Sequence, residues 1–502
     1  MRKSIALLQY AGSHSAALQA NALKAGALKR STLKTNALIT SALKTSTLRL
    51  AATVFCILSA ATLWAGEGKE FVTVKDGRFY LGEKEYRYVG TNLWYGAILG
   101  SEGKGGNRQR LIRELDDMYS VGIDNVRVLI GGDGRDGIQS HIAPKLQTAP
   151  GVYNDTILAG LDFLMMELER RNMRAVLYFN NAWEWSGGYG AYLDWVGYKG
   201  EVESSDGSGR KFFELTPVPS IDGWWEYMQY VSNFILNERA KALAANHVKK
   251  MVTRRNRYTG ELYKDSKALM AWEIANEPRC FINDSLHKAK FVEWIDEQSR
   301  LIKSLDPNHL VTTGSEGKHG CEEDINLFKA IHTLPAIDYA CIHIWPNNWG
   351  WIGKFNQNYD ADKTIAEDAP DPIVENVQAA CDSTMAYINE AHKVLEGHER
   401  PIVLEEFGYP RDRFLFDAGS PTKGRDIYYN YVFSIICSSG KIAGCNFWGW
   451  GGRANVKHTI WQRWDDYVCD PAQEEQGLNS VFYADKSTLE IIQKSAQTLK
   501  RR

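Results

Sequence analysis

The stretch Ala268-Leu-Met-Ala-Trp-Glu-Ile-Ala-Asn-Glu-Pro278 is an apolar run that ends in a carboxylate and is closed by proline. A second stretch, Pro401-Ile-Val-Leu-Glu-Glu-Phe-Gly408, has the same pattern and ends in glycine. Short apolar runs of this kind are typical of parallel strands that are buried on both faces. A parallel barrel presents its functional side chains at the carboxyl ends of such strands. The two stretches therefore predict two barrel strands that deliver glutamates to the same rim.

Strand-like and helix-like segments alternate through the rest of the chain. Strands are predicted at residues 87–91, 125–129, 174–179, 269–275, 310–313, 339–344, 402–405 and 442–447. Helices are predicted at residues 107–121, 156–171, 224–245, 287–305, 374–395, 424–438 and 487–499. A hairpin is expected over residues 71–85, and long loops over residues 187–222, 245–267 and 345–373. Eight strands that alternate with helices predict a (β/α)8 TIM barrel with an N-terminal hairpin and long βα loops.

The two strand ends carry the residues that could perform chemistry. Strand alternation places Glu273 and Glu277 on one face, with Glu277 at the end of the strand. Two carboxylates that face each other across a cleft are the minimum requirement for cleaving a glycosidic bond. Glu273 lies deeper, where we expect a structural carboxylate paired with an Arg. Because side chains alternate, only one of Glu405 and Glu406 is expected to point inward, and Glu405 is the competing candidate.

The charge is unevenly distributed along the chain. The net charge is −2, but residues 1–65 hold eight Lys and Arg and no Asp or Glu. The remaining 51 basic and 61 acidic side chains give residues 66–502 a net charge of −10. An acidic body without a basic patch argues against nucleic acid as a partner. This balance suits a soluble secreted enzyme that acts on a neutral polymer.

The first 65 residues have the pattern of a leader. A pentad repeat places Leu at every fifth position from 18 to 48, a period that matches neither helix nor strand, so we expect an extended low-complexity segment. A 14-residue apolar segment, Leu50 to Leu63, then follows Arg49 and precedes small residues. This pattern predicts a signal peptide, with an uncleaved anchor as the alternative. We expect residues 1–65 to be leader and signal, and residues 66–502 to be one catalytic domain that is secreted, extracellular or periplasmic. No stable membrane insertion is expected after signal removal.

The cysteines do not form a metal-binding pattern. Eight are present, without a CxxC pair or a Cys/His cluster, so no metal and no cofactor are predicted. Cys280 and Cys321 each follow a predicted strand end in neighbouring loops, which permits a disulfide in an oxidising compartment.

Several ordered motifs carry a family resemblance. The stretches Trp272-Glu-Ile-Ala-Asn-Glu-Pro-Arg-Cys280 and Leu404-Glu-Glu-Phe-Gly408 resemble the two signature strands of glycoside hydrolase family 5. The match runs from about residue 70 to the C-terminus. Further segments resemble its β-mannanase branch: Gly90-Thr-Asn-Leu-Trp94, Asn125-Val-Arg-Val128, Trp183-Glu-Trp-Ser-Gly-Gly188, Gly314-Ser-Glu-Gly317, His343-Ile-Trp-Pro-Asn-Asn-Trp349, Phe447-Trp-Gly-Trp-Gly-Gly452 and Gln476-Gly-Leu-Asn-Ser-Val-Phe482.

The resemblance implies roles for the glutamates and their neighbours. It implies retention of configuration through a covalent intermediate, with Glu277 as the general acid/base and Glu406 as the nucleophile. Arg127 is implied as the clamp on the nucleophile. Asn276 is implied to bind the 2-hydroxyl of the cleaved sugar, and His343 to donate within the same network.

The resemblance also implies an aromatic sugar-binding surface. Trp448 would form the stacking floor beneath the central sugar. Trp345 stands where many family members carry Tyr, and a Trp cannot supply a phenolic hydroxyl, so a Tyr-based hydrogen bond to the nucleophile is not expected here. The flanking subsites would be lined by Trp94, Trp183, Trp185, Trp349 and Trp450.

The leading hypothesis is a secreted, monomeric endo-β-1,4-mannanase whose partner is a β-mannan: mannan, glucomannan or galactomannan. A β-1,4-glucanase (cellulase) would use the same catalytic pair, and an exo-acting β-mannosidase or a transglycosylase of the same fold is a further alternative. A non-catalytic carbohydrate-binding protein is a different class of hypothesis. The presence of both Glu277 and Glu406 argues against it, since such a protein needs neither.

Overall fold

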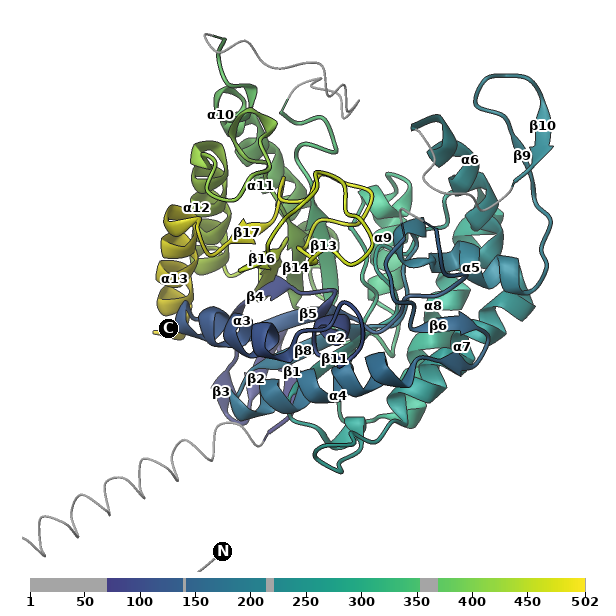
Figure 1. Cartoon of the computed structure of the whole chain (residues 1–502), viewed down its shortest axis with the longest axis horizontal. Coiled ribbons are helices and arrows are strands. Elements are labelled where there is room, and N and C mark those ends of the chain that lie inside the picture. The colour runs from purple at the N-terminus through teal and green to yellow at the C-terminus, as the bar shows by residue number, and fades with distance from the viewer. Residues whose placement is uncertain (1–69, 139–140, 214–220, 353–368, 502) are drawn as a thin grey trace, which may run out of the picture. The chain divides into compact units, whose positions relative to one another are not determined.

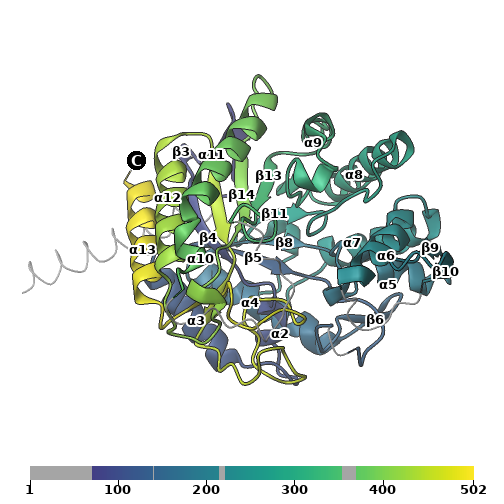
Figure 2. The ribbon, with the colours of Figure 1, turned by 90° about the horizontal axis from the view of Figure 1, so that it is seen from above.

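The computed structural model describes residues 70–138, 141–213, 221–352 and 369–501. The predicted leader and signal segment lie outside these residues, as does part of the loop predicted over 345–373. Residues 70–501 hold the predicted barrel, which Figure 1 shows from the side and Figure 2 from above, with helices around the central strands.

The barrel consists of eight parallel strands in the spatial order β12-β11-β8-β5-β4-β15-β14-β13. Their bounds in chain order are β4 (Tyr88–Asn92), β5 (Asn125–Leu129), β8 (Arg174–Tyr178), β11 (Leu269–Glu273), β12 (Leu310–Thr312), β13 (Ala340–Ile344), β14 (Ile402–Phe407) and β15 (Gly444–Phe447). The sheet closes between β12 and β13, where the Asp338 backbone N–H donates to the Val311 carbonyl at 2.8 Å. The predicted (β/α)8 fold is confirmed, and every predicted barrel strand overlaps an observed one.

The helices alternate with the strands around the barrel. They are α2 (Gly96–Leu99), α3 (Arg108–Ser120), α4 (Asp155–Arg170), α5 (Gly188–Trp195), α6 (Ile221–Val231), α7 (Glu238–Val252), α8 (Ser285–Leu305), α9 (Ile325–His332), α10 (Pro372–Glu375), α11 (Val377–Val394), α12 (Lys423–Ser438) and α13 (Lys486–Lys500). Helix α9 was not predicted. It begins after Asp324, whose side chain accepts from the backbone N–H groups of Asn326 and Leu327.

Two predicted helices are broken in the structure. The helix predicted over 224–245 divides into α6 and α7, and α7 begins after Asn237. Asn237 has an extended backbone, and its side chain accepts from the Ala240 backbone N–H. An asparagine in this position caps a new helix in place of continuing the old one. The helix predicted over 374–395 likewise begins as the short α10 and continues as α11.

A three-stranded hairpin unit closes the amino-terminal end of the barrel. It contains β1 (Val72–Lys75), β2 (Arg78–Leu81) and β3 (Lys84–Glu85), with Asp76 and Gly77 at positive φ in the first turn. Phe79 is fully buried and packs edge-on against Tyr339, with ring centroids 5.3 Å apart. The predicted hairpin is thus confirmed, and its apolar face forms part of the lower core.

The short remaining strands belong to the loops that connect the barrel elements. These are β6 (Gln147–Ala149), β7 (Val152–Tyr153), β9 (Glu201–Glu203), β10 (Arg210–Phe212), β16 (Trp450–Gly452) and β17 (Val481–Phe482). The long connection between β16 and β17 lies across the upper end of the barrel in Figure 1, where it is drawn in yellow.

The strand that carries the two adjacent glutamates departs from regular alternation. Between β13 and β14 the register moves from Ile342 opposite Leu404 to His343 opposite Glu406, so Glu405 has no counterpart. Such a bulge interrupts the alternation of side chains. Glu405 is fully buried and accepts from the Tyr339 hydroxyl at 3.1 Å, inside the lower barrel. The expectation that only one of the pair points inward is wrong: Glu405 lies deep in the barrel and Glu406 lies above it at the rim.

Two further structural expectations can be compared with the described chain. Cys280 and Cys321 are buried free thiols, and the Cys321 sulfur lies 3.9 Å from the Ser315 hydroxyl, so the structure does not contain the disulfide that we considered. None of the helices in the described ranges is both long enough and apolar enough to cross a membrane.

Candidate active site

Glu277 lies just beyond the end of β11 in a sharply turned backbone. Its φ is +50°, and its backbone N–H donates to the Gly314 carbonyl at 2.9 Å. One carboxylate oxygen accepts from His343 Nδ1 at 2.8 Å, and the other accepts from Trp183 Nε1 at 2.5 Å. The carboxyl is therefore held by two ring N–H donors from different loops.

Glu406 lies on β14, opposite His343 on β13. Its Oε1 pairs with Arg127 Nη1 at 2.5 Å, and its Oε2 accepts from Trp345 Nε1 at 3.2 Å. The indole N–H of Trp345 thus donates to the nearby carboxylate where a tyrosine would offer its hydroxyl.

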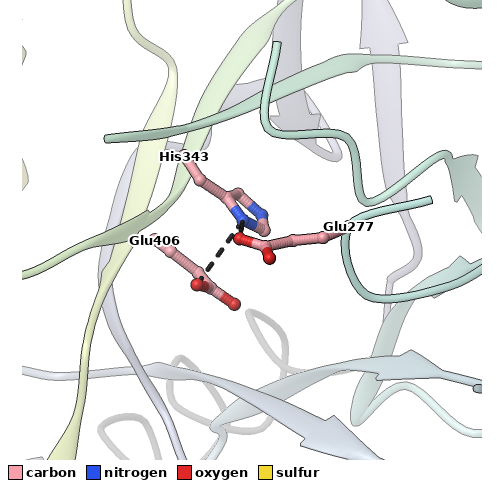
Figure 3. A group of neighbouring side chains, drawn as sticks. All are labelled: Glu277, His343 and Glu406. Atoms are coloured by element: carbon pink, nitrogen blue, oxygen red, sulfur yellow. Dashed lines mark hydrogen bonds and ion pairs between the residues drawn. The ribbon is translucent and has the colours of Figure 1, made fainter. Parts of the chain in front are cut away.

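The two glutamates and His343 converge on one point. One carboxylate oxygen each of Glu277 and Glu406 and one ring nitrogen of His343 lie within 4.8 Å of one another. Figure 3 shows the imidazole beside both carboxylates, which face each other. These are the donor types that bind divalent metals, so the cluster could also hold an ion. The hydrogen bonds and ion pairs to the carboxylates already account for the arrangement without one.

Arg127 on β5 supports the cluster from below. It is fully buried and pairs with both Glu406 and Glu273, the latter through Nε at 2.8 Å. Its Nη2 also donates to Asn276 Oδ1 at 2.8 Å. Glu273 therefore forms the predicted structural ion pair with an Arg. A guanidinium with five donors can fix several acceptors at once, and here it orients the nucleophile candidate and Asn276 together.

The two facing carboxyls differ in their neighbours. Burial raises the pKa of both Glu277 and Glu406 above 4.5, and the charge of Glu277 raises the pKa of Glu406 further. The direct ion pair with Arg127 opposes this effect at Glu406. At Glu277 the largest opposing charge is that of Arg279, which itself pairs with Glu316 at 2.6 Å, and Arg127 acts in the same direction. Carboxyls this close titrate as a pair. We assign the shared proton to Glu277, because Arg127 stabilises the anion on Glu406.

His343 is a neutral donor in this arrangement. Burial, followed by the charge of Arg127, lowers its pKa well below 6.5. Its Nδ1 lies 2.8 Å from Glu277 and 3.5 Å from Glu406, whereas its Nε2 has no hydrogen-bond partner among the described residues. The imidazole therefore carries its proton on Nδ1, facing the carboxylates.

A cavity of about 250 Å³ opens above the two glutamates. Besides these glutamates, six residues predicted to bind substrate line it: Asn276, Trp183, Trp185, Trp345, Trp349 and Trp448. Trp448 is 3% exposed, and its buried indole N–H has no partner among the described residues.

Two predicted subsite tryptophans are packed in the core and do not line this cavity. Trp94 is 1% exposed, and its Nε1 donates to the Cys469 carbonyl at 2.7 Å. Trp450 is fully buried, and its Nε1 donates to Glu114 at 2.8 Å. Their assignment to flanking subsites is corrected: both follow strand ends, but their indoles point into the protein and their N–H groups are satisfied there.

Several residues of the cavity wall were not predicted from the sequence. Glu184, Trp224, Arg279, Glu316 and Glu474 line the cavity as well. Glu184 stands inside the quoted motif Trp183-Glu-Trp, where two aromatic neighbours were a usable signal. Glu474 lies in a long loop without a periodic pattern, so only the fold brings it to the site.

Comparisons with known proteins agree with the motifs. A family model described as "GH family 5 beta-mannosidase-like" matches residues 69–502. The putative mannan endo-1,4-beta-mannosidase 4 of Arabidopsis thaliana is 26% identical over 452 residues, which cover 86% of this chain and 91% of the relative.

Solved structures show the same likeness. A glycoside hydrolase family 5 mannosidase from Rhizomucor miehei superposes with a TM-score of 0.72 at 28% identity, covering 87% of this chain and 99% of that chain. An endo-1,4-beta-mannanase from Rhizomucor miehei gives a TM-score of 0.57 at 21% identity, covering 86% of this chain and 100% of that chain.

Proposed function

Because the chain belongs to the β-mannosidase-like group of glycoside hydrolase family 5, we propose that it is a retaining glycosidase that cleaves β-1,4-mannosidic linkages of mannan, glucomannan or galactomannan. The preference for mannan rests on its relatives, which are named as mannan endo-1,4-beta-mannosidases and as a mannosidase. The observation that carries the mechanism is the close approach of Glu277 and Glu406, whose nearest oxygens lie within 4.8 Å. Carboxyl groups about 5–5.5 Å apart are typical of retaining enzymes, whereas inverting enzymes leave room for a water between them.

In the first step Glu406 attacks the anomeric carbon, and Glu277 gives its proton to the leaving oxygen. The ion pair with Arg127 keeps Glu406 ionised for this attack. In the second step Glu277, now an anion, takes a proton from a water that hydrolyses the glycosyl ester. His343 and Trp183 donate to the Glu277 carboxylate and stabilise the charge that it acquires between the steps.

The lining of the cavity supports the proposed sugar-binding roles. Asn276 Oδ1 is occupied by Arg127, and its amide donates to Asn181 at 3.1 Å. The second N–H of the amide is the one that would meet the 2-hydroxyl of the cleaved sugar. Trp448 would stack under this sugar and Trp345 beside it, since their rings lie edge to face with centroids 5.7 Å apart.

Azide rescue tests the assignment of the two glutamates. Glu406→Ala and Glu277→Ala should each lower turnover by several orders of magnitude while the thermal unfolding transition stays cooperative. With azide, Glu406→Ala should form the α-mannosyl azide and Glu277→Ala the β-mannosyl azide, distinguished by NMR of the product. Full activity in either alanine variant would overturn the assignment.

An exo-acting β-mannosidase is the second candidate. The mannosidase superposes with a TM-score of 0.72, against 0.57 for the endo-mannanase from the same organism. Viscosity loss relative to the release of reducing ends separates the two modes, since only an endo-acting enzyme lowers viscosity early. Initial rates on mannan and on carboxymethylcellulose test the remaining alternative, a glucanase.

We further propose that the catalytic domain begins near residue 66 and is secreted as a monomer after removal of the leader. The basic flank and the 14-residue apolar segment before Ala65 support this proposal. Mass spectrometry of the mature N-terminus tests it, and a mature protein that begins at Met1 would contradict it.

A further inference from the structure

We propose that Glu184 and Glu474 form the binding site for the leaving-group sugar, whose hydroxyl groups they bind. This inference rests on the proposed function and deepens it. Two residues outside the catalytic pair would thus make the cavity specific for a sugar as the leaving group.

Glu184 is a buried carboxyl that faces the cavity without a partner. It begins the single turn Glu184–Ser186, is 2% exposed and lines the same cavity as Glu277. Neither of its carboxylate oxygens has a hydrogen-bond partner among the described residues. Burial raises its pKa to about 7. Leaving a buried polar group unpaired is costly, so such groups are usually satisfied or functional.

Glu474 brings a second carboxyl to the same wall from a remote part of the chain. It is half-buried, lines the cavity and lies in the connection between β16 and β17. After burial, the charges of Asp470, Glu475, Glu184 and Glu277 raise its pKa. Glu184 and Glu474 line the same cavity, although 290 positions separate them in the sequence.

The loop that carries Glu474 is fixed by hydrogen bonds, so the position of this carboxyl is built into the fold. Asp470 accepts from the backbone N–H groups of Gly477, at 2.9 Å, and Asn479, at 3.1 Å. The Gln476 amide donates to the Pro471 carbonyl at 2.7 Å. These contacts tie both ends of the segment around Glu474 together.

The pair lies on the side of Glu277, which indicates the departing sugar. Trp183, the residue before Glu184, donates to Glu277 Oε2, and the charge of Glu277 acts on Glu474. The general acid stands next to the oxygen that leaves, whereas the nucleophile stands beneath the sugar that is retained. We therefore infer that the cavity residues next to Trp183 and Glu277 face the leaving group.

The chemistry of the pair fits sugar hydroxyls better than a cation. Within the described ranges, the side chains grouped closely enough to bind a metal ion are Glu277, His343 and Glu406. Neither Glu184 nor Glu474 belongs to this group. Burial raises the pKa of both carboxyls, and a protonated carboxyl can accept hydrogen bonds and donate one, which suits sugar hydroxyl groups.

Two substrates with the same glycone test the inference. β-1,4-Mannotriose and p-nitrophenyl β-mannobioside share a mannobiosyl group, but only the first has a hydroxylated leaving group. Glu184→Gln and Glu474→Gln should each lower kcat/KM on mannotriose about tenfold, the effect expected when one hydrogen bond to the sugar is lost. On the aryl substrate, measured as nitrophenol release from the mannobiosyl linkage, the change should stay within about threefold, well below that tenfold loss.

Glu475→Gln is the matched control, with the same substitution in the same loop. Thermal unfolding of each variant verifies the fold, and Glu474→Gln replaces a half-buried residue, so it keeps the test open if Glu184→Gln does not fold. Equal loss on both substrates, or no loss on either in folded variants, would overturn this inference alone. A wild-type protein that hydrolyses neither substrate would overturn the proposed function and this inference with it.

Discussion

At the scale of single residues, the indole N–H of Trp345 takes a position where the family resemblance implies a phenol. It donates to Glu406 at 3.2 Å, on the oxygen that Arg127 does not contact. An indole N–H can only donate a hydrogen bond and does not ionise. It therefore stabilises the ionised form of the Glu406 carboxyl.

We therefore expect Trp345→Phe to impair the nucleophile while the fold is kept. The lost donor should lower kcat about tenfold, because hydrogen bonds to charged groups contribute roughly 1.5–3 kcal/mol. Without this donor the pKa of the Glu406 carboxyl rises, so the acidic limb of the kcat/KM profile should move to higher pH. Trp351→Phe, a half-buried indole nearby that does not line the cavity, is the control. An unchanged rate and an unchanged acidic limb would contradict the role of this hydrogen bond.

Some site residues were visible in the sequence and others were not, for physical reasons. Glu277 and Glu406 could be predicted because each ends an apolar run and is followed within two residues by a strand breaker. The inward position of Glu405 could not, because a bulge depends on register with the neighbouring strand. The burial of Trp94 and Trp450 depended on partners 375 and 336 residues away.

At the scale of elements, the hairpin β1–β3 acts as a plug for the barrel. Its exposed side chains meet solvent, whereas Phe79 inserts beneath Tyr339 and joins the lower core. The catalytic groups lie at the opposite, carboxyl-terminal end of the strands. Stability and activity are therefore located at different ends of the same barrel.

Replacing Phe79 should lower the stability of the protein without lowering its activity. Phe79→Ala removes a fully buried ring and should lower the free energy of unfolding by about 3–5 kcal/mol. The kcat of the protein that remains folded should change little. Chemical denaturation and steady-state rates at low temperature measure the two effects. Thr73→Ala, at an exposed position on the same hairpin, is the control and should be close to neutral. A comparable loss of kcat in folded Phe79→Ala would contradict the separation.

The helices show how local signals compete. The stretch 224–245 has one helical pattern, yet α6 ends at Val231 and Asn237 caps the start of α7. Asparagine followed by Glu238 is a readable start signal, so this error was avoidable. The start of α10 is similar, since Asp371 caps it and Pro372 occupies its first position.

At the scale of the whole molecule, the barrel order and the number of strands follow from alternation along the chain, because parallel strands need crossover connections. The shape and lining of the cavity cannot be predicted from this alternation. Its walls come from Trp183 and Glu184 after β8, from Trp345 after β13 and from Glu474 before β17, and long loops carry no period that a pattern could reveal.

The buried acids of the barrel give the whole molecule a predictable response to pH. Burial, and then the charge of Glu273, raises the pKa of Glu405 from 4.5 to about 8. The folded chain thus keeps a proton that the unfolded chain releases above pH 4.5. The stability that this group contributes is fully present below pH 4.5 and is lost as the pH rises through about 8.

Glu405→Gln should remove this dependence, because glutamine does not titrate and its oxygen can still accept from Tyr339. Relative to the wild type, the variant should gain stability between pH 5 and pH 8, by about 1.4 kcal/mol per pH unit at most. Unfolding free energies, or melting temperatures where unfolding is irreversible, measured at each pH give the difference. Glu85→Gln on the exposed side of the hairpin is the control for loss of one negative charge. If the difference between Glu405→Gln and the wild type stays constant across this range, or grows in the opposite direction, then Glu405 is ionised inside the barrel and the assigned direction of its pKa shift is wrong.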